Sequence, residues 1–305
     1  MKAKVFFLSL LIALAGLGTM QAYNPQEDDV RGAFLTTRPK ASANTDKPGP
    51  SSRPSRRRPK TVKPGPVAVN SPTPSKGTVP GPSSTPDVAP RKGGSQRLGL
   101  GVTLFMRDSN GLSVRTDPTR TFRKGDHVRV LLETNADGYL YVFNTTDNGQ
   151  PVMIYPDAEL DEAGNYIQGH VPWEIPSSTA AEERLRWFTF DQTSGAEKLY
   201  FVFTREPLAT VPIEDDLINF CRENTGKCPW KPAADVWAQI KSELDEPVKV
   251  AKSEGFGKSQ TGPEQQAATR GIGLNRDDPE PSLIMLTAST SKNILVATMD
   301  LIHKS

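Results

Sequence analysis

A basic, proline-rich segment near the start limits what this chain can fold into. Residues 38–97 hold 13 of the 27 prolines, 13 Lys/Arg, only two Asp/Glu and no aromatic residue. Apolar side chains are too sparse there to offset the conformational entropy that ordering the backbone would cost. A core must therefore come from residues 98–305, which are enough for one large domain or two small ones.

The formal net charge of +2 is the sum of two opposite parts. Residues 38–97 carry +11 and residues 1–37 are neutral, so residues 98–305 carry −9. We predict a disordered linker over residues 23–97, with a polyproline II bias that keeps it extended, joined to an acidic body. The densest cationic cluster is the candidate contact with anionic surfaces such as phospholipid headgroups or wall polymers, and it consists of Arg56, Arg57, Arg58, Lys60 and Lys63.

The first 22 residues predict export. Lys2 and Lys4 precede an apolar run over residues 5–18, and the small Ala22 follows, which is typical of a secretory signal peptide. The run is shorter than the roughly 20 apolar residues of a membrane-spanning helix, and the alternative is an uncleaved membrane anchor. We therefore expect a secreted or periplasmic protein of the cell envelope, with no nucleic-acid partner.

The chain has two cysteines, Cys221 and Cys228. In an exported protein an even count favours a disulfide, and two free buried thiols are the alternative.

The acidic body has the periodicity of β-strands. Apolar residues alternate over 98–106 and 128–132, and the runs 139–143 and 199–203 are apolar on both faces, as in interior strands of a sandwich or of a sheet backed by helices. The sequence thus predicts a mainly β, antiparallel sandwich-like domain over residues 98–305. Turn residues between neighbouring runs predict hairpins that join 128–132 to 139–144, 139–144 to 152–155, 186–190 to 198–204, and 282–288 to 293–303.

A helical hairpin is expected as an insert at about residues 212–245. Its first helix places Ile213, Leu217, Phe220 and Cys221 on one face, and its second has an apolar stripe that includes Trp237. The predicted disulfide would clamp the turn between the two helices. Residues 253–281 show little periodicity and are expected to form a long mobile loop.

No pattern of residues predicts a catalytic, cofactor-binding or metal site. Each of His127, His170 and His303 stands alone in the sequence, which favours solvated positions near strand ends. Trp173 and Trp230 lie beside prolines in predicted loops, so they are the candidates for exposure and ligand contact.

An ordered set of short motifs resembles the bacterial domain-of-unknown-function 4384 family over about residues 120–208. The motifs are Phe122-Arg123-Lys124-Gly125-Asp126, then Asp137-Gly138-Tyr139-Leu140-Tyr141-Val142, Tyr155-Pro156, Ile175-Pro176, and the strand from Glu197 to Arg205. The resemblance implies an extracytoplasmic or surface-associated β module, for which no catalytic residues are established. The residues that it marks as structural are Gly125, Asp126, Gly138, Tyr139, Tyr141, Pro156, Pro176, Glu197, Tyr200 and Arg205.

Three of these residues have expected roles. Gly138 suits a turn position with positive φ. Asp126 can accept backbone hydrogen bonds where a strand begins. Arg205 is expected to pair with an acidic group such as Asp126 or Glu197.

These observations favour an exported, non-enzymatic interaction module held out by its basic linker. The alternatives are a carbohydrate- or wall-binding module that uses loop tryptophans, and a hydrolase that uses His127 or His170 with acidic neighbours.

Overall fold

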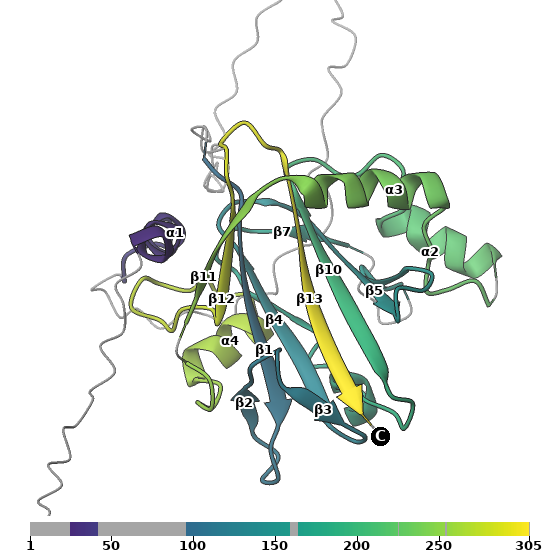
Figure 1. The fold of residues 1–305 in the computed structure, drawn as a ribbon, viewed down its shortest axis with the longest axis horizontal. Coiled ribbons are helices and arrows are strands. Elements are labelled where there is room, and N and C mark those ends of the chain that lie inside the picture. Colours follow the sequence, from purple (N-terminus) through teal and green to yellow (C-terminus); the bar gives the residue numbers. More distant parts are fainter. Residues whose placement is uncertain (1–24, 42–95, 159–163, 225, 254, 305) are drawn as a thin grey trace, which may run out of the picture.

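Two β-sheets pack against each other through apolar inner faces (Figure 1). The structure, a computed structural model, describes residues 25–41, 96–158, 164–224, 226–253 and 255–304. It is a mainly β, antiparallel sandwich with an inserted helical hairpin, as the sequence predicts.

The first sheet runs in the order β11-β12-β1-β4-β8, with β2 paired to β1 and β9 paired to β4. Its strands are β1 (Gly99–Arg107), β2 (Ser113–Arg115), β4 (His127–Thr134), β8 (Trp173–Ile175), β9 (Phe188–Thr189), β11 (Val248–Lys252) and β12 (Leu283–Thr287).

The second sheet runs in the order β3-β13-β10-β5-β6, with β7 paired to β5. Its strands are β3 (Thr121–Arg123), β5 (Gly138–Thr146), β6 (Val152–Tyr155), β7 (Tyr166–Ile167), β10 (Gly195–Thr204) and β13 (Ile294–Lys304). Within the described ranges every pairing is antiparallel except that of β3 with β13.

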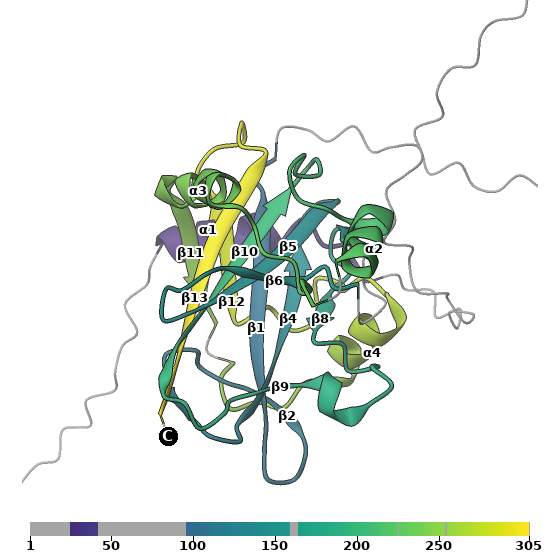
Figure 2. The same cartoon turned by 90° about the vertical axis from the view of Figure 1, so that its right-hand side faces the viewer.

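Helices cover the outer faces of both sheets, which explains why the interior strands are apolar on both sides. On the second sheet lie α2 (Glu214–Glu223) and α3 (Ala234–Ser242) (Figure 2). Trp237 of α3 packs against Phe143 and Tyr200. On the first sheet, α1 (Pro25–Leu35) packs beside β11 and β12, while α4 (Gly262–Arg270) contributes Ala268 to a small cluster on β1 and β4. Two short 3-10 turns, η1 (Glu183–Arg186) and η2 (Glu243–Asp245), complete the described elements.

Three of the predicted hairpins are wrong, and each fails in the same way. The loops after β4, after β9 and after β12 carry the chain from the first sheet to the second, so the strands that flank them do not pair. Instead β4 pairs with β1, β9 with β4, and β12 with β1 and β11. Only the predicted hairpin of β5 and β6 forms. A short polar loop between two apolar strands has the same sequence pattern whether it turns within a sheet or crosses between sheets.

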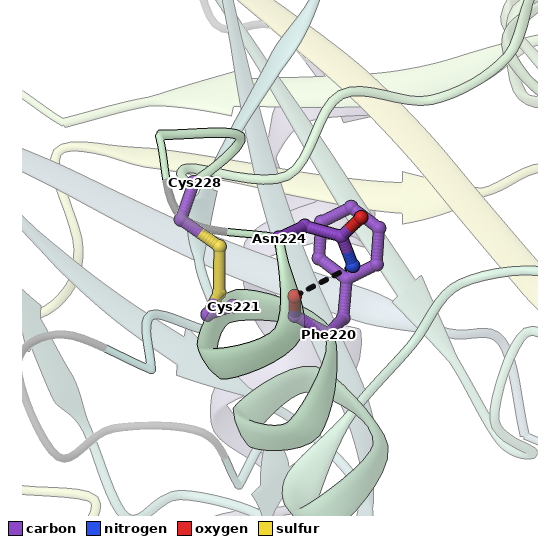
Figure 3. The surroundings of a disulfide bond; sticks show 4 residues. All are labelled: Phe220, Cys221, Asn224 and Cys228. Carbon is purple, nitrogen blue, oxygen red and sulfur yellow. Dashed lines mark hydrogen bonds between the residues drawn. A yellow bond between two sulfur atoms is a disulfide. The ribbon is translucent and has the colours of Figure 1, made fainter.

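The helical hairpin and its disulfide are confirmed. Cys221 and Cys228 are bonded, with their Cα atoms 5.5 Å apart, and the bond closes the turn after α2 (Figure 3). Beside it the Asn224 side chain donates a hydrogen bond to the carbonyl of Phe220 at 2.9 Å, where the helix ends.

The expectation of a mobile loop over residues 253–281 is wrong, because α4 lies within it. Thr261 and Glu264 form a capping box at its start, and Gly271 closes it in the left-handed conformation with φ 68°. The Thr-x-x-Glu spacing was present in the sequence, but the short helix has a weak apolar stripe. Glu264 also forms a buried ion pair with Arg115, which fixes α4 to the first sheet.

The prediction of a disordered linker over residues 23–97 is wrong for residues 25–41. Val30 and Phe34 of α1 are fully buried against Ile284 and Leu286. Arg38 is also buried and forms a bidentate ion pair with Glu133 of β4 at 2.8 and 2.7 Å. Three backbone carbonyls, those of Asn275, Asp278 and Pro279, take its remaining hydrogen bonds.

The described residues at both ends of the basic segment are attached to the domain. Residues 25–41 are bound to the first sheet, and Arg97, just before β1, forms an ion pair with Asp29 of α1 at 3.3 Å. Residues 42–95 lie between these two attachments and are outside the described residues, as are the predicted signal peptide over 1–22 and the cluster at Arg56 to Lys63. None of the helices in the described part of the chain has the length and apolar content needed to cross a membrane.

The attachment of residues 25–41 can be tested by cutting the chain. After cleavage at a protease site placed within residues 42–95, we expect the N-terminal fragment to stay bound to the rest during size-exclusion chromatography. Arg38→Ala leaves Glu133 buried without its main partner, which costs about 3–5 kcal/mol and should release the fragment. Lys40→Ala, an exposed neighbour, should retain it. Release of the fragment from the cut wild-type chain would contradict this attachment.

The disulfide should stabilise the protein by reducing the conformational entropy of the unfolded chain. Replacing both cysteines by alanine is expected to lower the free energy of unfolding in urea by about 2–3 kcal/mol, the loop-closure value for so short a loop. A reducing agent should destabilise the wild-type protein by the same amount and leave the double variant unchanged. Equal stability of the oxidised wild type and the variant would show that the bond does not constrain the chain.

Candidate functional site

A cavity of about 420 Å³ opens between the two sheets, at the end of the sandwich where β10 begins and β13 ends. It is formed by β4 and β9 of the first sheet, by β5, β6, β10 and β13 of the second, and by the loop from β9 to β10. The lining residues are Val128, Val130, Asn144, Thr146, Ile154, Phe188, Thr189, Phe190, Asp191, Thr193, Ser194, Glu197, Leu199, Leu301 and His303. A mostly apolar pocket with a few convergent polar groups is the usual form of a ligand site.

The polar side chains reach the cavity because of strand alternation. Successive side chains of a strand point to opposite faces, so Glu197 shares the inner face of β10 with the core residues Leu199 and Phe201. In the same way His303 shares the inner face of β13 with Leu301. Asn144 and Thr146 continue the inner face of β5. The inner face of the second sheet thus changes from apolar to polar at this end.

Glu197 is the centre of the polar group. Its Oε2 accepts hydrogen bonds from Asn144 Nδ2 at 2.8 Å and from Thr146 Oγ1 at 2.9 Å. Its Oε1 lies 3.8 Å from His303 Nε2, which is beyond hydrogen-bond distance. Strand pairing fixes this arrangement, since Glu197 lies opposite Thr146 on one side and Leu301 on the other.

Two buried polar atoms of the lining residues have no hydrogen-bond partner within the described part of the chain: Asn144 Oδ1 and His303 Nδ1. The orientation of the Asn144 amide follows from its donor bond to Glu197. Leaving a buried polar atom unpaired costs roughly 1–3 kcal/mol. The polar end of the cavity lining thus holds two polar atoms that the described chain does not satisfy.

The motif Gly125-Asp126 holds one wall of the cavity. Gly125 N donates to the carbonyl of Phe190 at 2.9 Å, and Phe190 N donates to the carbonyl of Asp126 at 3.1 Å. Gly125 has φ 82°, and the Asp126 carboxylate accepts from Arg123 N at 3.0 Å, which confirms the expected role of Asp126. The Phe190 ring packs on the His303 ring with their centroids 5.0 Å apart. These residues therefore position the cavity wall.

Two of the roles expected for the structural residues are wrong. Gly138 does not have a positive φ; it is needed because a Cβ there would lie 2.3 Å from the carbonyl oxygen of Thr204 on the neighbouring strand. Arg205 pairs with neither Asp126 nor Glu197, but donates to the carbonyl of Gln96 at 2.6 Å. Both roles depend on strands that are distant in the sequence.

The other structural residues lie away from the cavity. Tyr139, Tyr141 and Tyr200 pack on the outer face of the second sheet beneath α2 and α3. Pro156 and Pro176 each follow a cis peptide bond.

The expected exposure of the two loop tryptophans is wrong. Trp173 is 2 % exposed, and it packs in the core between the sheets. Trp230 is 9 % exposed, and its carbonyl accepts a hydrogen bond from Met153 N at the edge of the second sheet. The prolines beside them mark loops that fold inward, so these side chains do not form a platform for sugar stacking.

The histidines differ from the expected solvated positions, since His170 and His303 are both 5 % exposed. His170 lies between Glu133 Oε1 and Thr37 Oγ1, at 2.8 Å from each. Burial favours a raised pKa for Glu133, but hydrogen bonds from His170 and Arg38 hold that pKa below its ordinary value. The hydroxyl of Thr37 also donates to the carbonyl of Phe34 at 2.6 Å. The contacts among Thr37, His170 and Glu133 thus attach the N-terminal segment to the first sheet. The third histidine, His127, forms a hydrogen bond with Thr189 at 2.8 Å.

Metal ligands do not gather in the part of the chain that the structure describes, where no group of three or more His, Cys, Asp or Glu side chains could hold an ion. The chemistry of the cavity is that of a carboxylate, an amide, an imidazole and a hydroxyl among apolar walls. This arrangement can accept hydrogen bonds from a bound molecule.

Residues 121–207 match the family described as "Domain of unknown function (DUF4384)". The match confirms the resemblance seen in the sequence. It covers every lining residue of the cavity except Leu301 and His303. No curated protein and no solved structure matched the chain.

The sequence carried a signal for this site that the search for motifs missed. Glu197 and His303 continue the alternation of apolar inner-face residues on their strands, so a polar residue stands where an apolar one is expected. Such a break in pattern is expected at functional sites. The sequence alone does not show that β10 and β13 are neighbours.

If the polar group serves a ligand rather than the fold, removing it should cost little stability. Asn144→Leu is expected to change the free energy of unfolding by less than about 1 kcal/mol, because it removes a buried unpaired atom as well as a hydrogen bond. Asn135→Leu is the matched control, since Asn135 bonds to the backbone of Gly99 and Arg97 and its loss should cost about 2–3 kcal/mol. Urea unfolding measures both, and an equal loss would assign Asn144 to the fold.

Proposed function

We propose that this chain, which carries a domain of the DUF4384 family over residues 121–207, is an exported, non-enzymatic interaction module that holds its ligand in the cavity between the sheets. The observation that carries the proposal is the polar end of an otherwise apolar core. Glu197, Asn144 and His303 occupy inner-face positions beside a cavity of the size of small-molecule sites.

Binding rather than catalysis is supported by how the polar groups are engaged. In a catalytic relay the hydroxyl donates to an imidazole and the imidazole donates to a carboxylate, each within hydrogen-bond reach. Here the hydroxyl of Thr146 donates to Glu197, and His303 Nε2 is 3.8 Å from the same carboxylate. The hydroxyl, the imidazole and the carboxylate are therefore not arranged as a relay.

Export is supported by the signal-like residues 1–22 and by the disulfide, since disulfides persist in oxidising compartments. The basic segment remains the proposed contact with anionic polymers or lipids of the envelope, through Arg56, Arg57, Arg58, Lys60 and Lys63. The chain is attached at both ends of this segment, through the ion pairs of Arg38 and Arg97. The contact is therefore proposed for a segment held at two points, and not for a tether held at one.

The binding role of the cavity can be tested by closing its mouth. Thr193 is exposed and lines the cavity, so Thr193→Trp should block it without disturbing the core. We expect native mass spectrometry of the mature chain, after incubation with a cell-envelope extract, to show a bound small molecule that this variant loses. The matched control is Gln192→Trp, an equally exposed neighbour outside the cavity lining, which should keep the ligand.

Retention of the same ligand by both variants would place binding elsewhere. Capture of no ligand by the wild-type chain would remove the support for the proposed function.

A further inference from the structure

We infer that the ligand of this cavity is an amphiphilic amine, with an ammonium head at Glu197 and an apolar body between the sheets. This inference rests on the proposed function and names the chemical class of its ligand.

The charge of the lining favours a cation. Glu197 and Asp191 are the carboxylates of the cavity, and among its described lining residues there is no lysine or arginine. Lys198, next to Glu197, points to the opposite face of β10 and pairs with Asp300 at 3.3 Å. An anionic ligand would meet uncompensated negative charge in a partly desolvated site, where like charges repel strongly.

The hydrogen-bonding groups favour a donor with several protons. Within the described residues, Asn144 Oδ1 and His303 Nδ1 are buried and unpaired. An amide oxygen accepts hydrogen bonds and cannot donate them. An ammonium group carries three donors and no acceptor, so it suits the carboxylate of Glu197, which only accepts. Hydrogen bonds between an ammonium and a carboxylate are about twice as strong as neutral ones.

The apolar walls indicate the rest of the ligand. Opposite the polar group lie Val128 and Val130 of β4, and Phe188 and Phe190 form the wall toward the closing loop. Burying an alkyl chain there gains roughly 0.8 kcal/mol for each methylene group. A small hydrophilic cation would leave these walls in contact with water, so the structure favours a ligand in which an ammonium group and an apolar chain belong to one molecule.

The direct test is titration calorimetry of the mature chain with n-octylammonium, with n-octanol and octanoate as neutral and anionic controls of equal length. Methylammonium tests the head without the body. We expect n-octylammonium to bind at least about tenfold more tightly than octanol, with no measurable binding of octanoate or methylammonium. Each tenfold corresponds to about 1.4 kcal/mol of binding free energy.

Two carboxylate variants locate the effect. Glu197→Gln keeps an acceptor for Asn144 and Thr146 but removes the charge, and it should weaken n-octylammonium binding about tenfold to a hundredfold while octanol binding changes little. Asp300→Asn removes a carboxylate on the outer face of the adjacent strand, and it should bind as the wild type does. Thermal unfolding of each variant confirms that it is folded.

The outcomes separate this inference from the proposed function. Octanol or octanoate could bind as tightly as n-octylammonium or more tightly, and lose that binding in Thr193→Trp. This result would overturn the inference that the ligand is an amine, but it would keep the cavity as a binding site. If Glu197→Gln and Asp300→Asn weaken the binding of n-octylammonium equally, the cation is attracted by the net charge of the protein and not by Glu197, and the inference fails. If none of the four probes binds, the inference fails, and the extract experiment alone then decides the proposed function.

Discussion

The rest of the structure depends on the contact between the inner faces of the two sheets, which requires apolar side chains at the inward-facing positions. Because strand side chains alternate, every second residue of β4, β5, β10 and β13 faces the other sheet. Along most of their length these positions are apolar and fully buried, as Leu140, Phe201 and Leu295 are. At one end Glu197 and His303 take such positions beside a cavity. Burying polar groups costs free energy, so this exception is better explained by a ligand than by the fold.

Other carboxylates in the domain are buried with an arginine. Glu133 pairs with Arg38 and Glu264 pairs with Arg115, and each pair fixes a covering segment to the first sheet. Such pairs add little net stability but are costly to break, so they determine where the segments lie. Glu197 differs, since it forms no ion pair with an arginine or lysine among the described residues, and His303 Nε2 lies 3.8 Å from its Oε1. The contrast supports a cation from outside the chain as its partner.

Structure that depends on residues close together in the chain was predicted from the sequence. Pairing between strands that are distant in the chain was not. The helices of the insert, the disulfide and the β5–β6 hairpin depend on residues close together in the chain. The wrong hairpins depend on which sheet a strand joins, and this is decided by strands that are not its neighbours in the sequence, as when β12 pairs with β1. The candidate site shows the same limit. Glu197 and His303 each break an apolar pattern that can be read from the sequence, but only the pairing of β10 with β13 brings them together.

The central claim is that the polar end of this core is a ligand site for a cation. A crystal structure of the mature chain with n-octylammonium tests it most directly. The account predicts the ammonium nitrogen within hydrogen-bond distance of Glu197 Oε1, with the alkyl chain between Val130 and Phe190. An alkylammonium bound only outside this cavity would contradict it.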